Sequence, residues 1–275
     1  MVKVRRLSAA LLVLVMAMTA GACGKKAEDP ELVPQVAPPV IGEAGVLRAG
    51  IDLSYPPFGG VDDGVQAGID VDVAAAVAER LGLKLEIVDL KPNELAAAVN
   101  DGGVDIALGA TPITDAVLAD VSTAGSYLVD GAGIFSLETS GSAETTLTAS
   151  DITGKRIGVQ KESAVYWTLE SDYGQGFATS YPTIREAFDA LKAGEVDLVI
   201  GGAAVGAYVA RDFEGIRFAG QFDPAQPLGV LVKKDATDLE TQVRTVLDTL
   251  ASEGVLDAIR NKWLGSLPEL DVASE

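Results

Sequence analysis

The sequence has no histidine and a single cysteine among its 275 residues. Without histidine, the commonest general base near neutral pH and the commonest metal ligand are both missing, which disfavours catalysis and metal binding. The one cysteine, Cys23, has no disulfide partner within the chain. Basic residues are also scarce, 21 against 40 acidic ones, and the net charge of −19 repels phosphate backbones. We therefore expect no nucleic-acid partner, and we do not expect catalysis, although carboxylate chemistry stays open.

Residues 1–22 have the pattern of a secretory signal peptide. Three basic residues precede the apolar run LSAALLVLVMAMTA, which is too short to span a bilayer comfortably. The small residues TAGAC then lead into Cys23 and resemble a bacterial lipobox, whose cysteine is diacylated and becomes the first residue of the mature chain. The alternative is an incidental thiol near an ordinary cleavage site. Because two acyl chains give stable attachment, we expect an extracytoplasmic protein anchored to the membrane by lipidated Cys23.

The segment 23–45 follows the cleavage site and contains four prolines without any helical or strand periodicity. This composition predicts an extended, flexible tether between the lipid and a globular body. A disordered leader without a role would look the same.

Past residue 45, short apolar runs alternate with amphipathic stretches, which indicates βαβ units around parallel sheets. The first helix starts near Ile69, has an apolar face that runs to Leu81, and ends at Gly82; Asp70 and Asp72 are expected on its solvated start, favoured by the helix dipole. Strands are predicted at 46–51, 84–90, 104–110, 156–160 and 196–202. Helix N-caps are predicted at Asn93, Thr114, Ser163 and Thr183, and a long helix is predicted near 237–252.

The two halves of this region follow one plan. AAAVNDGGVDIALGA (96–110) is echoed by AFDALKAGEVDLVIGG (187–202), in each case a helix that ends in glycine and feeds an apolar strand. We expect two lobes, each with a sheet, whose carboxyl strand edges face a common cleft. The candidate ligand-binding residues at those edges are Asp52, Tyr55, Phe58, Ala110, Thr111, Thr114, Glu162, Ser163 and Gly202.

An ordered series of motifs resembles the family 3 solute-binding proteins of ABC importers, the polar amino-acid type. The motifs are DLSYPPF (52–58), GIDVDVA (68–74), GKRIGVQKESA (154–164), ALKAGEVDLVI (190–200) and GVLVKK through KWLG (229–265). The resemblance implies a type II periplasmic-binding-protein fold of α/β class, with two crossover strands at 131–137 and 226–232. It places lobe one at 46–133 plus 230–265, lobe two at 134–229 and a tail at 266–275, closing like a Venus flytrap.

The departures from the family pattern bear on the solute. Family members that bind amino acids carry an arginine for the α-carboxylate, where this chain has Ala116 or Val117. No lysine or arginine occurs between Lys91 and Lys155, so a gap cannot supply one. An aspartate for the α-amino group is replaced by Gly202, and a small anion-binding turn is replaced by residues 162–164, which include Glu162.

Each candidate has a plainer alternative. Phe58 is either a stacking surface or core, Asp52 pairs with a ligand cation or caps a turn, and Thr114 and Ser163 bind solute or only cap helices. Tyr55 is favoured for the cleft. Lys161 and Arg185 could still offer positive charge from lobe two.

The sequence therefore favours a lipid-anchored, monomeric binding protein without cofactor or metal, and not an enzyme. Its partners would be a small polar solute and ABC permease and ATPase subunits encoded elsewhere. The missing clamps favour a neutral or cationic solute. The alternatives are a sensor that presents its ligand to a receptor, and a dehydratase-like enzyme with Glu162 as its acid.

Overall fold

The computed structural model describes residues 32–138 and 146–272, so the predicted signal peptide and Cys23 lie outside the described residues. In chain order the elements are β1 (Val46–Ile51), β2 (Gly60–Asp62), β3 (Val65–Ala67), α1 (Ile69–Arg80), β4 (Lys84–Asp89), α2 (Pro92–Asn100), β5 (Ile106–Leu108), α3 (Asp115–Asp120), β6 (Ser122–Asp130), β7 (Ala132–Leu137), η1 (Ala149–Ile152), β8 (Ile157–Gln160), α4 (Ala164–Tyr173), β9 (Thr179–Tyr181), α5 (Ile184–Lys192), β10 (Leu198–Gly202), α6 (Ala203–Ala210), β11 (Ile216–Gln221), β12 (Gln226–Val232), α7 (Thr237–Ser252) and α8 (Val255–Leu264).

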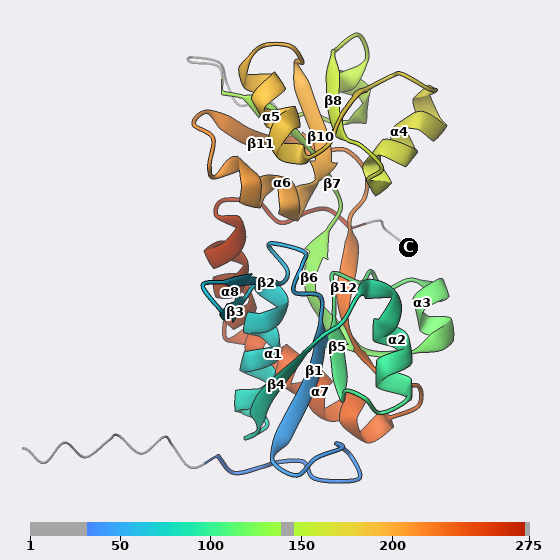
Figure 1. Cartoon of the computed structure of the whole chain (residues 1–275), viewed down its shortest axis with the longest axis vertical. Coiled ribbons are helices and arrows are strands. Elements are labelled where there is room, and N and C mark those ends of the chain that lie inside the picture. The colour runs from blue at the N-terminus through green and yellow to red at the C-terminus, as the bar shows by residue number, and fades with distance from the viewer. Residues whose placement is uncertain (1–31, 139–145, 273–275) are drawn as a thin grey trace, which may run out of the picture. The chain divides into compact units, whose positions relative to one another are not determined.

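The first sheet has the strand order β4-β1-β5-β12-β6 (Figure 1). Its strands β4, β1 and β5 are parallel, while β12 runs antiparallel to both β5 and β6. Helices α1, α7 and α8 cover one face of this sheet, and α2 covers the other. The parallel strands with helices on both faces are the arrangement that the alternating pattern predicts, whereas the antiparallel β12 makes the sheet a mixed one.

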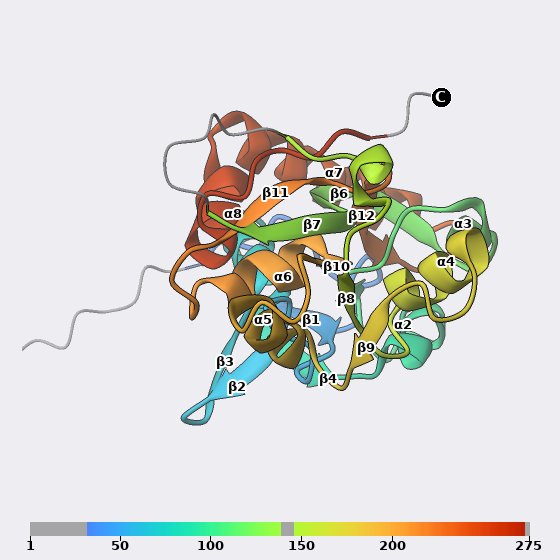
Figure 2. The ribbon, with the colours of Figure 1, turned by 90° about the horizontal axis from the view of Figure 1, so that it is seen from above.

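The second sheet has the order β11-β7-β10-β8-β9, which Figure 2 shows from above. Here β9, β8 and β10 are parallel, and β7 runs antiparallel to β10 and β11. In each sheet four strands therefore run in one direction, and one strand, β12 in the first sheet and β7 in the second, runs opposite to them. The repeat of 96–110 by 187–202 corresponds to α2 and β5 in the first sheet and to α5 and β10 in the second.

The chain passes from the first sheet to the second at Gly131, between β6 and β7, and returns through residues 222–225, between β11 and β12. The carbonyl of Gly131 accepts a hydrogen bond of 2.7 Å from the Ala203 amide, at the start of α6. From Gln226 onward, β12 pairs only with strands of the first sheet. The lobe boundaries proposed from the sequence stay a prediction.

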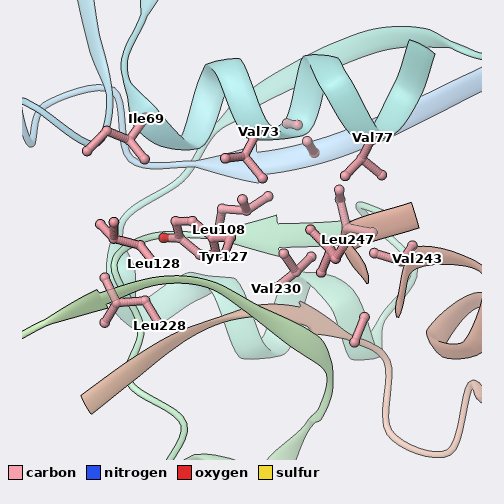
Figure 3. Close-up of a cluster of buried hydrophobic side chains, with 14 of the residues drawn as sticks. Ile69, Val73, Val77, Leu108, Tyr127, Leu128, Leu228, Val230, Val243 and Leu247 are labelled. Atoms are coloured by element: carbon pink, nitrogen blue, oxygen red, sulfur yellow. The ribbon is translucent and has the colours of Figure 1, made fainter. Parts of the chain in front are cut away.

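The largest buried cluster lies between α1, α7 and the first sheet (Figure 3). Val73 and Val77 of α1 meet Val230 of β12 and Leu247 of α7 in this cluster. Burial of each such side chain contributes roughly 1.5–3 kcal/mol relative to exposure. This packing explains why the apolar face predicted for α1 is buried along its length.

Two local details differ from the sequence analysis. The N-cap of α2 is Lys91 and not Asn93, because Pro92 takes the first helical position, where its missing N–H costs nothing. The Lys91 amide instead donates to the Glu94 carboxylate at 2.8 Å. The predicted tether is also shorter at its C-terminal end, because Val36 and Ile41 are buried in the main core. A free tether therefore has to end before Val36.

Candidate functional site

The candidate residues follow the carboxyl ends of parallel strands in both sheets, as expected for α/β proteins. Asp52 comes directly after β1 and Ala110 shortly after β5 in the first sheet. Glu162 follows β8, and Gly202 ends β10, in the second sheet. The chain order thus places each of these residues at a carboxyl strand edge.

Asp52 is almost fully buried beneath the turn that follows β1. Its Oδ1 accepts hydrogen bonds from the Ser54 amide (2.9 Å) and the Ser54 hydroxyl (2.6 Å), and Lys91 Nζ lies at 3.4 Å. Burial opposes ionisation of Asp52, but the hydrogen bonds from Ser54 and the Lys91 charge outweigh it, so its pKa is lowered. The Asp52 carboxylate therefore caps the turn, which is one of the two roles expected of it; the other was pairing with a cation of the ligand.

Tyr55 and Phe58 stack on each other, with ring centroids 5.4 Å apart and planes inclined by 15°. Phe58 is fully buried, whereas 44% of Tyr55 is exposed. Gly68 lets the chain enter α1 beside this pair, because its φ is +147° and a Cβ there would lie 2.1 Å from the Phe58 carbonyl oxygen. Phe58 thus forms the floor of the turn, and Tyr55 is the ring that a solute can reach.

The segment after β5 supplies Ala110, Thr111 and Thr114, all half-buried. Ala110 has a φ of +49°, a left-handed conformation that is uncommon outside glycine. Thr111 is held by its carbonyl, which accepts from the Gly229 amide at 2.9 Å. Thr114 is the N-cap of α3, as predicted, with its hydroxyl accepting from Val117 N at 3.4 Å.

At the edge of the second sheet, fewer of the candidate side chains are free to bind a solute. Glu162 is 70% exposed and lies 3.6 Å from Lys161 Nζ, a surface ion pair of little energetic weight. The Ser163 hydroxyl donates to the Gln160 carbonyl (2.8 Å) and accepts from the Tyr166 amide (3.1 Å), so its capping role occupies it. At Gly202, a Cβ would meet no atom within 4 Å. Arg185 pairs with Asp212 and lies over the Phe213 ring.

Asp70, predicted to lie on a solvated helix start, is instead buried, with 1% of its surface exposed. Its Oδ1 accepts a hydrogen bond of 2.6 Å from the Tyr127 hydroxyl. Burial raises the pKa of Asp70 to about 7, and hydrogen bonds from Tyr127 and the Ala110 amide oppose that rise. The signal was present in the sequence: Asp70 precedes Val73 and Val77 by three and seven residues, and so shares their buried face.

Asp130 carries a further carboxyl group, which was not predicted from the sequence and which lies where the chain crosses between the sheets. Asp130 ends β6, and its Oδ1 accepts from the Ala204 amide in the first turn of α6 at 2.9 Å. Burial raises the pKa of Asp130 to about 6, against the effect of the Ala204 and Gly131 amides. The charges of Asp130 and Asp70 also raise the pKa of Tyr55, after burial as the main cause.

The main cavities of the described chain lie elsewhere. Cavities of about 690, 480 and 430 Å³ surround α6, α8 and the segment after α8, and none is lined by a candidate residue. In residues 32–138 and 146–272, no helix has the length and apolarity needed to cross a membrane. The same ranges contain no group of three or more acidic or cysteine side chains placed to hold a metal ion.

Comparison with known proteins identifies a family. A family model described as bacterial extracellular solute-binding proteins, family 3, matches residues 47–266. The L-cystine-binding protein TcyJ of Escherichia coli (strain K12) is 26% identical, over 92% of this chain and 94% of that protein. The L-arginine-binding protein of Pseudomonas aeruginosa is also 26% identical, over 79% and 87%.

Among solved structures, an ancestral cationic amino acid solute binding protein, AncCDT-1, is 25% identical, with a TM-score of 0.69. The match covers 80% of this chain and 96% of the ancestral protein. The α/β fold of type II periplasmic binding proteins, expected from the motifs, is thereby confirmed.

Proposed function

Because the chain belongs to the bacterial extracellular solute-binding proteins of family 3, we propose that it captures a small polar solute between two lobes and delivers it to an ABC permease. A solute that contacts both sheet edges only when they approach each other favours the closed arrangement by its differential affinity. The names of the relatives, which bind L-cystine and L-arginine, support a solute related to amino acids.

The solute class is inferred mainly from the sequence directly after β5, which has no basic residue to bind an α-carboxylate. Ala116, in the first turn of α3, is exposed, and Val117 packs on the core beside α2. No lysine or arginine occurs between Lys91 and Lys155. A carboxylate buried without a charged donor is costly, since bidentate guanidinium pairing is the strong form of its recognition.

The partner of an α-amino group is missing in the same way, because Gly202 stands where the family has an aspartate. Acidic groups instead occur on the first sheet, where burial and then the charges of Asp130 and Asp70 raise the pKa of Tyr55, and Asp52 is buried at the start of the same turn. Lys91 is the nearby cation, and Asp52 and Ser54 already engage its ammonium. This charge balance favours a neutral or cationic solute that does not depend on a free α-carboxylate.

Attachment to the membrane through lipidated Cys23 belongs to the same proposal, supported by the lipobox-like sequence TAGAC and the proline-rich residues after it. The dehydratase alternative gains no support, because Glu162 is a solvent-exposed carboxylate whose ion-pair partner among the described residues is its neighbour Lys161. A general acid in a cleft is usually tuned by burial or by a partner that orients it.

Native mass spectrometry of the protein purified without denaturation tests the proposal. We expect a bound species of a few hundred daltons that lacks a free α-carboxylate, and that raises the melting temperature when added back to stripped protein. A protein that carries no small molecule, and whose melting temperature does not respond to a broad library of amines, amides and amino acids, would contradict solute capture.

A further inference from the structure

The first turn of α6 has no cap from its own N-cap residue, and the end of β6 supplies one. Gly202 is the N-cap of α6 and has no side chain to accept from the free amides of the first turn. Instead, Oδ1 of Asp130, the last residue of β6, accepts from the Ala204 amide at 2.9 Å. The Gly131 carbonyl accepts from the Ala203 amide at 2.7 Å. Two neighbouring residues of the crossover therefore satisfy the first two amides of α6.

This cap joins the two sheets. β6 pairs with β12 in the first sheet, whereas Gly202 ends β10 and pairs with Ala132 of β7 in the second. Ala203 and Ala204 are nevertheless buried in the main core cluster, to which Leu228 of β12 also belongs. The first turn of α6 thus packs in the core of the first sheet, directly after the strand that brings Gly202 to the edge of the second.

The crossover at Gly131 is tightly packed against the segment by which the chain returns. A Cβ at Gly131 would lie 2.9 Å from the Cα of Ala225, on the returning segment. The Asp223 carboxylate of that segment accepts from the Ala132 amide at 3.1 Å. The Ala132 carbonyl in turn accepts from the Phe222 amide at 2.8 Å. The outgoing and returning segments are therefore bonded to each other next to the start of α6.

We propose that Asp130 is a positioning residue of the solute site, which from the first sheet fixes the start of α6 and hence the orientation of Gly202 at the edge of the second. The proposal rests on the function proposed above, in which a solute contacts both edges. A carboxylate suits this position, because a hydrogen bond from a helix N-terminus to a carboxylate is charge-assisted and favoured by the helix dipole. Without the Asp130 carboxylate, we expect the second sheet to vary more in its orientation relative to the first.

Distances between spin labels test this positioning without any solute. The labels are introduced by Ala97→Cys on α2 and Asp189→Cys on α5, two exposed positions on the corresponding helices of the two sheets. The full chain also carries Cys23→Ser, so that the labelled cysteines are its only thiols. Double electron–electron resonance should give a broader distance distribution in Asp130→Ala than in the chain with Asp130. Asp130→Asn, which keeps an oxygen that can accept from the Ala204 amide, should restore the distribution.

The matched control is Asp197→Ala. Asp197 also accepts from a backbone amide, that of Arg156 at 2.9 Å, but it precedes β10 and so lies at the opposite end of that strand from Gly202. Its substitution should leave the distance distribution as it is. No broadening in Asp130→Ala, or equal broadening in Asp197→Ala, would overturn the proposal.

Hydrogen exchange in Asp130→Ser keeps the test decisive if Asp130→Ala does not fold. The serine side chain is too short to reach the Ala204 amide, so this amide should exchange about tenfold faster or more. The Ala203 amide, which donates to the Gly131 carbonyl, should change less. Unchanged exchange at Ala204 would count against Asp130 as the group that holds α6. Because neither measurement needs a solute, a failure here leaves solute capture standing, and a failure of solute capture leaves the measured link between the sheets.

Discussion

The two sheets carry their candidate residues in different ways. At the edge of the first sheet, Asp52 and Phe58 are buried, and Ala110 has a left-handed φ of +49°. At the edge of the second sheet, Glu162 is exposed and Gly202 offers no side chain. We propose that the first sheet holds the selective, preorganised half of the site, because fixed polar groups give specificity when they cost no reorganisation. In this proposal the second sheet contributes mainly backbone groups and closure.

The largest effect is expected from removing Phe58, the buried ring beneath the turn after β1. Phe58→Ala should lower the free energy of unfolding by about 3–5 kcal/mol, because Phe58 is fully buried and leaves a cavity. Tyr55→Ala, the matched control on the same turn, should cost roughly 1 kcal/mol or less, since Tyr55 is 44% exposed. Urea denaturation followed by circular dichroism measures both. Equal decreases in the free energy of unfolding would contradict the distinction between a buried Phe58 and an exposed Tyr55.

The next effect concerns Asp70 and pH. Because burial raises its pKa from 3.8 to about 7, the folded protein keeps a proton that the unfolded chain loses. Stability due to this group is present below pH 4 and is lost as the pH rises to 7, by up to about 4 kcal/mol. Asp70→Asn should remove most of this decline in the free energy of unfolding, measured at pH 5, 6, 7 and 8.

A smaller decline should remain in Asp70→Asn, because burial also raises the pKa of Asp130, to about 6. Asp72→Asn is the control, since Asp72 is paired at the surface with Lys262 and should leave the pH dependence as it is. The same decline in Asp70→Asn as in the unmodified chain would show that Asp70 is charged at pH 5, contrary to its burial.

A smaller effect, of about 1 kcal/mol in the free energy of unfolding, is expected from the N-cap hydroxyls of Ser163 and Thr114. Ser163 lies at the edge of the second sheet and Thr114 at the edge of the first. Ser163→Ala should cost about 0.5–2 kcal/mol of stability, because the hydroxyl makes two hydrogen bonds and caps α4, which is anchored by buried Leu169. Thr114→Ala should cost less, because its hydrogen bond is long, at 3.4 Å, and α3 has no buried residue. Its main effect should fall on the affinity for the co-purified solute, measured by calorimetry. The reverse pattern would place recognition on the second sheet.

Local signals in the sequence were enough to predict much of the fold. The helix predicted near 237–252 is α7, and Thr183 and Ser163 cap α5 and α4 as expected, since capping chemistry is local. The position of Asp70 could have been found from its spacing to Val73 and Val77. Asp130 could not, because its burial depends on α6 folding against the crossover, a contact across 74 residues. The end of the tether near Val36 depends on a similar long-range contact.

The central claim is that the site has no clamp for an α-amino acid zwitterion, and isothermal titration calorimetry with L-arginine and L-cystine tests it most directly. We predict that the purified, ligand-free protein binds either no tighter than about 1 mM, because residues 92–154 contain no lysine or arginine to pair with the α-carboxylate. Micromolar binding of either amino acid would contradict the account, and would mean that a cation from outside the 92–154 region reaches the site.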